Sequence, residues 1–173
     1  MTNKTIYQDA PLYSHSFFDL VETDNLLSEL RNSEQLTMQV FQRITPENEN
    51  ISYQPNKWTT KEVIRHIIDC ERVYSYRAFR FSRFDSTDLP GFDENQYIDR
   101  MKPINLNLND LKEEYEIVRR STIAVFKTMT QEMLDFKGTA NGVCFTARAL
   151  GFMTVGHNLH HCHFLDAHYL RAQ

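Results

Sequence analysis

The chain has 173 residues, a length that suits one domain with a substantial core, and its composition of 41% hydrophobic and 24% charged residues is ordinary for a globular protein. The net charge is −4 and no basic run occurs, so nucleic acid is not an expected partner. With five glycines and five prolines, the sequence disfavours a turn-rich β-sandwich and favours long helices.

The sequence shows no sign of a membrane or secretory location. No apolar run approaches the roughly 20 residues of a membrane span, and the N-terminal stretch lacks the uninterrupted apolar core of a signal peptide. Cys70, Cys144 and Cys162 are an odd number of cysteines without Cys-x-x-Cys spacing, so we expect free thiols in a reducing compartment. We therefore expect a cytoplasmic protein with a single domain over residues 1–173.

Two periodic segments occupy the first half of the chain. The first covers about residues 18–44 and ends before the polar stretch TPENENISYQPN. The second opens at WTTKEVIRH and runs to about Phe84. Thr59 or Thr60 is its expected N-cap, and Glu62 stands where a capping box requires an acid. Trp58 precedes the cap and is expected to pack as a hydrophobic staple.

Two further periodic segments follow a long polar stretch. Residues 85–107 form this stretch, and connections of such length in compact domains are often functional or lid-like. The third segment begins at Asn107 or Asn109 and reaches about Met129, and the fourth runs from about Thr146 to about Arg171. Four amphipathic helices predict an all-α four-helix bundle with a long loop between the second and third helices. Long connections leave the helix order open.

The fourth segment contains five of the seven histidines, within GHNLHHCHFLDAHYL. Residues three and four apart share one face of a helix. His160 lies at the edge of the inward face, and His163 lies outside it. The inward face consists of Leu150, Met153 or Thr154, His157, His161, Phe164 and His168.

The second segment also places a histidine at a core position. Its inward face consists of Val63, His66, Cys70, Val73 and Arg77. An i,i+4 pair such as His157 and His161 can bind one cation, and His66 from a neighbouring helix would complete a three-nitrogen set that leaves open positions, as in catalytic zinc sites. The alternative is a group of core histidines that satisfy one another by hydrogen bonds. Cys70 is expected to act as a small buried hydrophobe.

Several sharper motifs are absent from the sequence. HNLHH has the outer spacing of a zincin motif, but Asn158 replaces the general-base glutamate. No Glu-x-x-His occurs, which excludes the di-iron plan of ferritin-like bundles. Cys-x-x-Cys-His is also missing, which excludes covalent c-type haem.

Three stretches, WTTKEVIRHIIDCERVYSYR, LPGFDENQYI and TARALGFMTVGHNLHHCHFLDAHYL, resemble the signature regions of the DinB/YfiT-like superfamily over about residues 20–170. That family consists of four-helix bundles regarded as metal-dependent enzymes. Its pattern has one ligand histidine after a Trp–Ser/Thr–x–Lys–Glu helix start and two in a Gly-His-x-x-x-His element. The resemblance implies His66, His157 and His161 as ligands of a divalent ion, with zinc or nickel the usual candidates. Relatives include thiol-cofactor-dependent transferases and isomerases.

The main functional hypothesis is a metal-dependent enzyme that acts on a small molecule. It would be a transferase that attaches a low-molecular-weight thiol to an electrophile, or a hydrolase, because a bound cation can lower the pKa of a water or a thiol. The alternative is a non-catalytic protein that binds or senses a metal, or that acts in a stress response through partners. A homodimer is one possible assembly, and the sequence does not determine the oligomeric state.

Three other residues are candidates for a supporting role. Asp93, beside Glu94, matches an acidic element of the relatives and is expected either above the metal or in a turn or cap. Arg77 is expected to bind an anionic substrate or to have a structural role. In the structural role it would form an ion pair or extend its charged end toward solvent. His160 is a candidate for a contact that supports the metal site. Alternatively, either His160 or Cys162 could be a fourth metal ligand, which would close the site.

Overall fold

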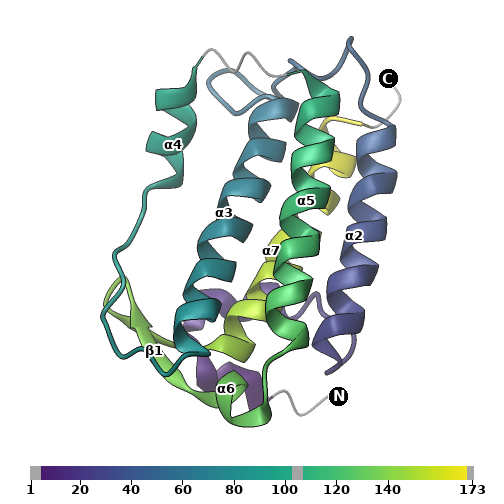
Figure 1. Cartoon of the computed structure of the whole chain (residues 1–173). Coiled ribbons are helices and arrows are strands. Elements are labelled where there is room, and N and C mark those ends of the chain that lie inside the picture. The colour runs from purple at the N-terminus through teal and green to yellow at the C-terminus, as the bar shows by residue number, and fades with distance from the viewer. Residues whose placement is uncertain (1–4, 103–106, 171–173) are drawn as a thin grey trace.

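The computed structural model describes residues 5–102 and 107–170. Four long helices form the bundle: α2 (Leu26–Gln42), α3 (Thr60–Phe81), α5 (Leu108–Lys127) and α7 (Ala147–His168). The predicted all-α four-helix bundle is therefore confirmed (Figure 1). None of the helices in the described part of the chain has the length and apolar character that a membrane span needs.

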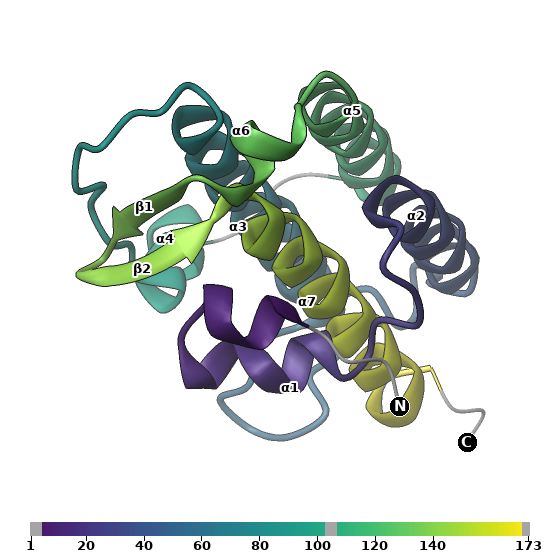
Figure 2. The same ribbon diagram turned by 90° about the horizontal axis from the view of Figure 1, so that it is seen from below.

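The helices form a ring in which α7 and α5 are diagonally opposite. Each of these two helices contacts both α2 and α3 (Figure 2). Figure 1 shows α3 and α5 running from the top of the view to the bottom, whereas α2 and α7 run upward. Because α3 and α5 are parallel, the segment between them must return along the bundle, about 30 Å for a helix of this length. This explains why residues 85–107 form so long a connection.

Side-chain caps are present at three helix starts, and two of them, at Thr59 and Asn107, were predicted from the sequence. Thr59 accepts a hydrogen bond from the Glu62 amide while the Glu62 carboxylate accepts from the Thr59 amide, a complete capping box. Asn107 caps α5 and Thr146 caps α7 by the same type of side-chain bond. These bonds satisfy amides that the first helical turn leaves without partners.

The predicted first helix is wrong at its N-terminal end. The chain forms a short α1 (His15–Phe18), leaves the helix, and starts again at Leu26. The Asn25 side chain accepts from the Ser28 amide at 3.1 Å and so caps α2, and the Glu29 carboxylate accepts from the Thr23 amide at 3.1 Å. These local side-chain bonds compete with helical backbone bonds and set the later start.

The ends of two other helices also differ from the prediction. Helix α3 ends at Phe81 rather than Phe84, and Phe84 has a φ of 59°, in the left-handed region that does not continue a helix. Helix α7 ends at His168, and the predicted end at Arg171 lies outside the described residues.

A β-hairpin between α5 and α7 was not predicted. Strands β1 (Lys137–Ala140) and β2 (Val143–Thr146) pair antiparallel, with Ala140 opposite Val143. The turn residues Asn141 and Gly142 have φ values of 55° and 71°, as a two-residue hairpin turn requires. Asn-Gly is the strongest short hairpin signal, so the sequence contained the information.

Smaller helical elements complete the chain. The 3₁₀-helices η1 (Thr5–Asp9) and η2 (Leu12–Ser14) lead into α1, which packs on α7. Helix α6 (Gln131–Asp135) precedes the hairpin. Helix α4 (Glu94–Met101) lies within the predicted loop, and residues 103–106 of that loop lie outside the described residues.

The return segment between α3 and α4 is attached to the hairpin tip. The Leu89 amide donates to Thr139 O at 3.0 Å, and the Asn141 amide donates to Leu89 O at 2.8 Å. A Cβ at Gly91 would lie 2.2 Å from the Asn141 side-chain oxygen, so this close approach requires glycine. The segment and the hairpin therefore form one continuous wall beside α3 and α7.

A buried ion pair joins three of the four helices. Arg119 is fully buried, and its Nε and Nη2 each donate to a carboxylate oxygen of Glu71 at 2.8 Å. Its Nη1 donates to Leu30 O at 2.8 Å and to Ser33 Oγ at 2.6 Å. Burial alone would lower the pKa of Arg119, but the adjacent Glu71 carboxylate raises it above its ordinary value. The charge is thus compensated inside the core.

The substitution Glu71→Gln should lower the free energy of unfolding by about 3–5 kcal/mol, because it leaves the Arg119 charge buried without its carboxylate. Urea denaturation measures the loss. The matched control is Asp166→Asn, whose partner is Arg43 and whose pair is half exposed (side-chain exposures of 52% and 51%). We expect a cost of at most about 1 kcal/mol there, and equal effects of the two substitutions would contradict the assignment.

Candidate metal centre

Helices α3 and α7 bring three histidines together inside the bundle. His66 lies on the second turn of α3, and His157 and His161 lie one turn apart on α7. Preceding His157, Gly156 packs against α1, where a Cβ would lie 2.1 Å from Phe17 O. Glycine at this position therefore lets α1 lie directly against the turn of α7 that carries His157.

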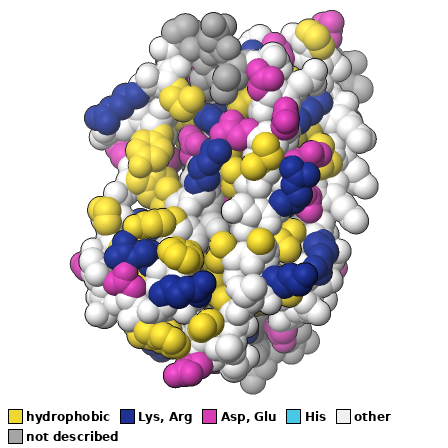
Figure 3. Space-filling model, viewed as in Figure 1, with side chains coloured by type: hydrophobic (Ala, Val, Ile, Leu, Met, Phe, Trp, Pro, Cys, Tyr) yellow, Lys and Arg dark blue, Asp and Glu magenta, His cyan; other side chains and the backbone are white. Residues whose placement is uncertain are grey.

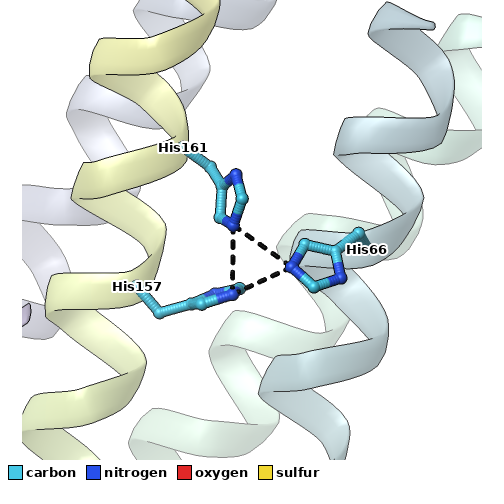
Figure 4. Close-up of side chains that lie close together, drawn as sticks. All are labelled: His66, His157 and His161. Carbon is cyan, nitrogen blue, oxygen red and sulfur yellow. Dashed lines mark hydrogen bonds between the residues drawn. The ribbon is translucent and has the colours of Figure 1, made fainter. Parts of the chain in front are cut away.

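The three imidazole rings converge through the same ring atom (Figure 4). The Nε2 of His66 is 3.0 Å from that of His157 and 3.1 Å from that of His161, and the two α7 histidines are 3.2 Å apart at Nε2. His66 and His157 are buried, and His161 is partly buried. The convergence of the three predicted residues is thus present in the structure.

This triangle cannot satisfy its own hydrogen bonds. A neutral imidazole Nε2 is either a donor or an acceptor. Because there are three Nε2 atoms and each is either a donor or an acceptor, at least two of them must have the same role. At least one of the three close contacts therefore places two donors or two acceptors face to face. A cation resolves the conflict because all three lone pairs can point to it. The arrangement therefore fits a metal ion better than a hydrogen-bonded cluster of core histidines.

The spacing of the nitrogens also fits a common metal. Zinc–nitrogen bonds are about 2.0–2.1 Å long, and two such bonds at angles between octahedral and tetrahedral place their nitrogens roughly 2.9–3.4 Å apart. Cys70 Sγ lies 3.6 Å from Nδ1 of His66. The same sulfur lies 3.8 Å from Nε2 of that ring, so Cys70 packs against the His66 ring and does not accept a hydrogen bond along the Nδ1–H direction.

Burial keeps the three imidazoles neutral. Desolvation, with a smaller contribution from His160, lowers the pKa of His66 to about 4. Desolvation and the nearby His66 lower the pKa of His161 to about 2. The pKa of His157 is lowered well below its usual value by its complete burial and then by the other histidines. Neutral imidazole is the form that binds a metal, so the site is prepared for one at neutral pH.

Aromatic rings enclose the histidines on several sides. Trp58 lies 4.8 Å from the His66 ring, and Phe17 and Tyr74 lie edge-on to His157 at 5.5 and 5.7 Å between ring centroids. The sequence predicted a packing role for Trp58, whereas no role was predicted for Phe17 or Tyr74. Tyr74 could have been found, because it lies two turns after His66 on the same face of α3.

Two cavities meet at the histidines from different directions. The first, of about 260 Å³, is bounded by His66 and His157. The second, of about 300 Å³, is bounded by His161. The first turn of α4 contributes to both, with Glu94 in the first and Asn95 in the second. The predicted lid-like segment therefore forms part of the walls of both cavities.

The three supporting candidates are placed differently. Asp93 is exposed and caps α4, with its carboxylate accepting from the Gln96 amide at 3.0 Å. Arg77 is buried in the first cavity. His160 is exposed, with its ring centroid 5.0 Å from that of His161.

The described residues provide no fourth protein ligand. Among them, the side chains that are grouped closely enough to share a metal ion are the three histidines. Cys162 is buried on the other side of α7, where its Sγ contacts Thr37 Oγ1 at 3.4 Å. Figure 3 shows no described histidine on the face viewed as in Figure 1, and the exposed His160, His163 and His168 therefore lie on other faces. A bound ion would thus keep positions open toward the two cavities.

The comparisons with known proteins agree with this architecture. The sequence matches the model of the DinB superfamily over residues 29–165. One similar structure is YfiT from Bacillus subtilis, described as a probable metal-dependent hydrolase with an unusual four-helix bundle topology; identity is 16%, the TM-score is 0.70, and the alignment covers 84% of this chain and 82% of YfiT. Another is the mycothiol-dependent maleylpyruvate isomerase, with 16% identity and a TM-score of 0.69, where 91% of this chain covers 63% of that chain. Curated proteins gave no match.

The metal-free protein should lose stability as the pH falls below about 6.5. There the histidines of the unfolded chain take up protons while the buried three remain neutral, so protonation favours the unfolded state down to about pH 4, the pKa of His66. Urea denaturation of chelator-treated protein between pH 7 and 5 should show a loss of about 1 kcal/mol or more per pH unit.

A variant with His66, His157 and His161 all changed to Gln serves as the control and should show a much smaller slope. An unfolding free energy that stays constant in the unsubstituted protein over this pH range would contradict the neutral state of the three rings.

Proposed function

The chain belongs to the DinB superfamily, and we propose that it is a metal-dependent enzyme whose His66, His157 and His161 hold one divalent cation, zinc or nickel. The observation that carries this proposal is the triangle of Nε2 atoms at 3.0–3.2 Å, which no assignment of imidazole protons satisfies. The absence of a fourth ligand among the described residues favours a catalytic site over a storage or sensing site.

The protein contributes position, orientation and a dry environment. When bound, a divalent cation supplies a positive charge that lowers the pKa of a neighbouring water or thiol. Cys70 packs against the His66 ring, and the rings of Trp58, Phe17 and Tyr74 limit access of bulk water. Cys70 is not the nucleophile, because burial raises the pKa of its thiol to about 12.

We favour transfer of a low-molecular-weight thiol to an electrophile over hydrolysis. Two separate cavities reach the histidines, which suits a reaction between two molecules larger than water. In this reaction the thiol loses its proton, a sulfur–carbon bond forms, and the leaving group departs with the bonding electron pair. The thiol dependence in the name of one structural neighbour supports the same choice.

We also propose that the protein works in a reducing compartment such as the cytoplasm. The support is that Cys70, Cys144 and Cys162 are all free in the structure. The small-molecule substrate that we propose agrees with cavities of about 260 and 300 Å³, near the lower end of ligand-binding volumes.

Metal analysis tests the site directly. Protein purified from unsupplemented cells should contain about one equivalent of zinc or nickel by mass spectrometry, and a His157→Ala, His161→Ala double variant should contain almost none. The matched control replaces two exposed histidines of the same helix, His163 and His168, and should retain the metal. Equal metal content in the two double variants would refute the site.

Turnover distinguishes transfer from hydrolysis and from simple metal binding. At pH 6.5 a free thiol with a pKa of about 8.5 is roughly 1% ionised, so holding it as thiolate can accelerate reaction with an electrophile by up to about 100-fold. Thiol consumption should depend on metal and disappear in the His157→Ala, His161→Ala variant. Metal-dependent cleavage of esters or amides without thiol would favour a hydrolase, and metal binding without either activity would favour the non-catalytic alternative.

A further inference from the structure

Arg77 is a buried cation beside the histidines. It lies on α3 about three turns after His66, or about 16 Å along the helix axis. Its residue exposure is 6%, and it lines the cavity of about 260 Å³ that His66 and His157 also line. Long side chains on a helix lean toward its N-terminus, which for Arg77 is the direction of His66.

The guanidinium of Arg77 has no acidic partner among the described residues. Its Nη2 donates to Pro90 O at 2.8 Å, and its Cζ lies 5.6 Å from the centroid of the Phe92 ring. The other two buried arginines differ in this respect. Arg119 forms two bonds to Glu71, and Arg65 lies 2.6 Å from a Glu114 carboxylate oxygen.

A buried charge without a counterion is costly, and proteins ordinarily pair it. The charged side chains that line the cavity are Arg77 and Glu94, and Glu94 is exposed to solvent, which weakens its effect. Three neutral polar groups, from Tyr13, Tyr74 and Asn141, complete the polar part of the lining. With a divalent ion on the histidines the cavity would be strongly positive.

We propose that Arg77 binds a carboxylate of the electrophilic substrate and so selects anionic small molecules. The planar guanidinium fork matches a carboxylate in a way that a lysine ammonium does not. The carboxylate lies toward the Arg77 end of the cavity, and the reacting atom lies toward the histidines. This inference rests on the proposed function, because it takes the histidine triangle as the reacting end.

Thiols of graded length can test the span between the two ends. The cobalt-loaded protein is titrated with ω-mercaptoalkanoates and with the matching ω-mercaptoalcohols, and binding is followed by the thiolate-to-cobalt charge-transfer absorption. We expect the acid to bind about 10- to 100-fold more tightly than the alcohol at a preferred chain length, the factor that a charge-assisted hydrogen bond provides.

In Arg77→Met this preference should vanish while the affinity for the alcohols stays unchanged, which shows that the cavity is intact. Arg77→Lys should recover part of the preference. The control is Arg72→Met, on the same helix but outside this cavity and paired with Glu114, and it should behave as the unsubstituted protein. Equal binding of acids and alcohols at every length, or an unchanged preference in Arg77→Met, would overturn the inference.

A second measurement separates this inference from the proposed function. In metal-free protein with ¹⁵N-labelled arginine, the Arg77 Nε–H resonance, identified by its loss in Arg77→Met, should shift on titration with hexanoate and not with hexanol. Failure of any thiol to bind the cobalt protein would count against the metal site, whereas an Arg77 resonance that does not respond to hexanoate would count against the carboxylate.

Discussion

The enclosure of α7 by the other elements is the constraint on which the rest of the structure depends. From Ala147 to Asn158 every residue of this helix except Arg148 is buried. A Cβ at Gly151 would lie 2.6 Å from a Leu26 methyl group, and one at Gly156 would lie 2.1 Å from Phe17 O. Glycine at these two positions lets α1 and α2 pack directly on this helix, and the close packing restrains its rotation and sliding. This rigidity fixes the direction in which its two inward histidines project toward α3.

Buried polar groups in this protein differ in how completely protein partners satisfy them. The Arg119 guanidinium bonds to a carboxylate, a carbonyl and a hydroxyl, and its role is to join helices. In the histidine triangle at least one contact is not a hydrogen bond, and Arg77 has no acidic partner among the described residues. Tyr115 Oη and Asn158 Oδ1 are also buried without a hydrogen-bond partner among the described residues, so what distinguishes the histidines and Arg77 is the cavity beside them.

The order of the helices connects the fold to the site. Because α3 and α5 are parallel, the chain must return along the bundle between them, and this return segment passes beside α3. It supplies Pro90 and Phe92 next to Arg77, and the first turn of α4 contributes a lining residue to each of the two cavities. A simple antiparallel connection would need only a short turn and would leave the histidines open on that side.

The sequence by itself determined the class of fold, the main helices, the caps at Thr59 and Asn107, and the family, because helical periodicity, capping and motif spacing are local properties of the chain. It also selected His66, His157 and His161, since each takes a core position on its helix face. Tertiary packing decided their convergence through Nε2 and the parallel order of α3 and α5. It also decided that Arg77 has no acidic partner among the residues that the structure describes. These features depend on the relative rotation and direction of helices that are far apart in sequence, which one-dimensional spacing does not encode.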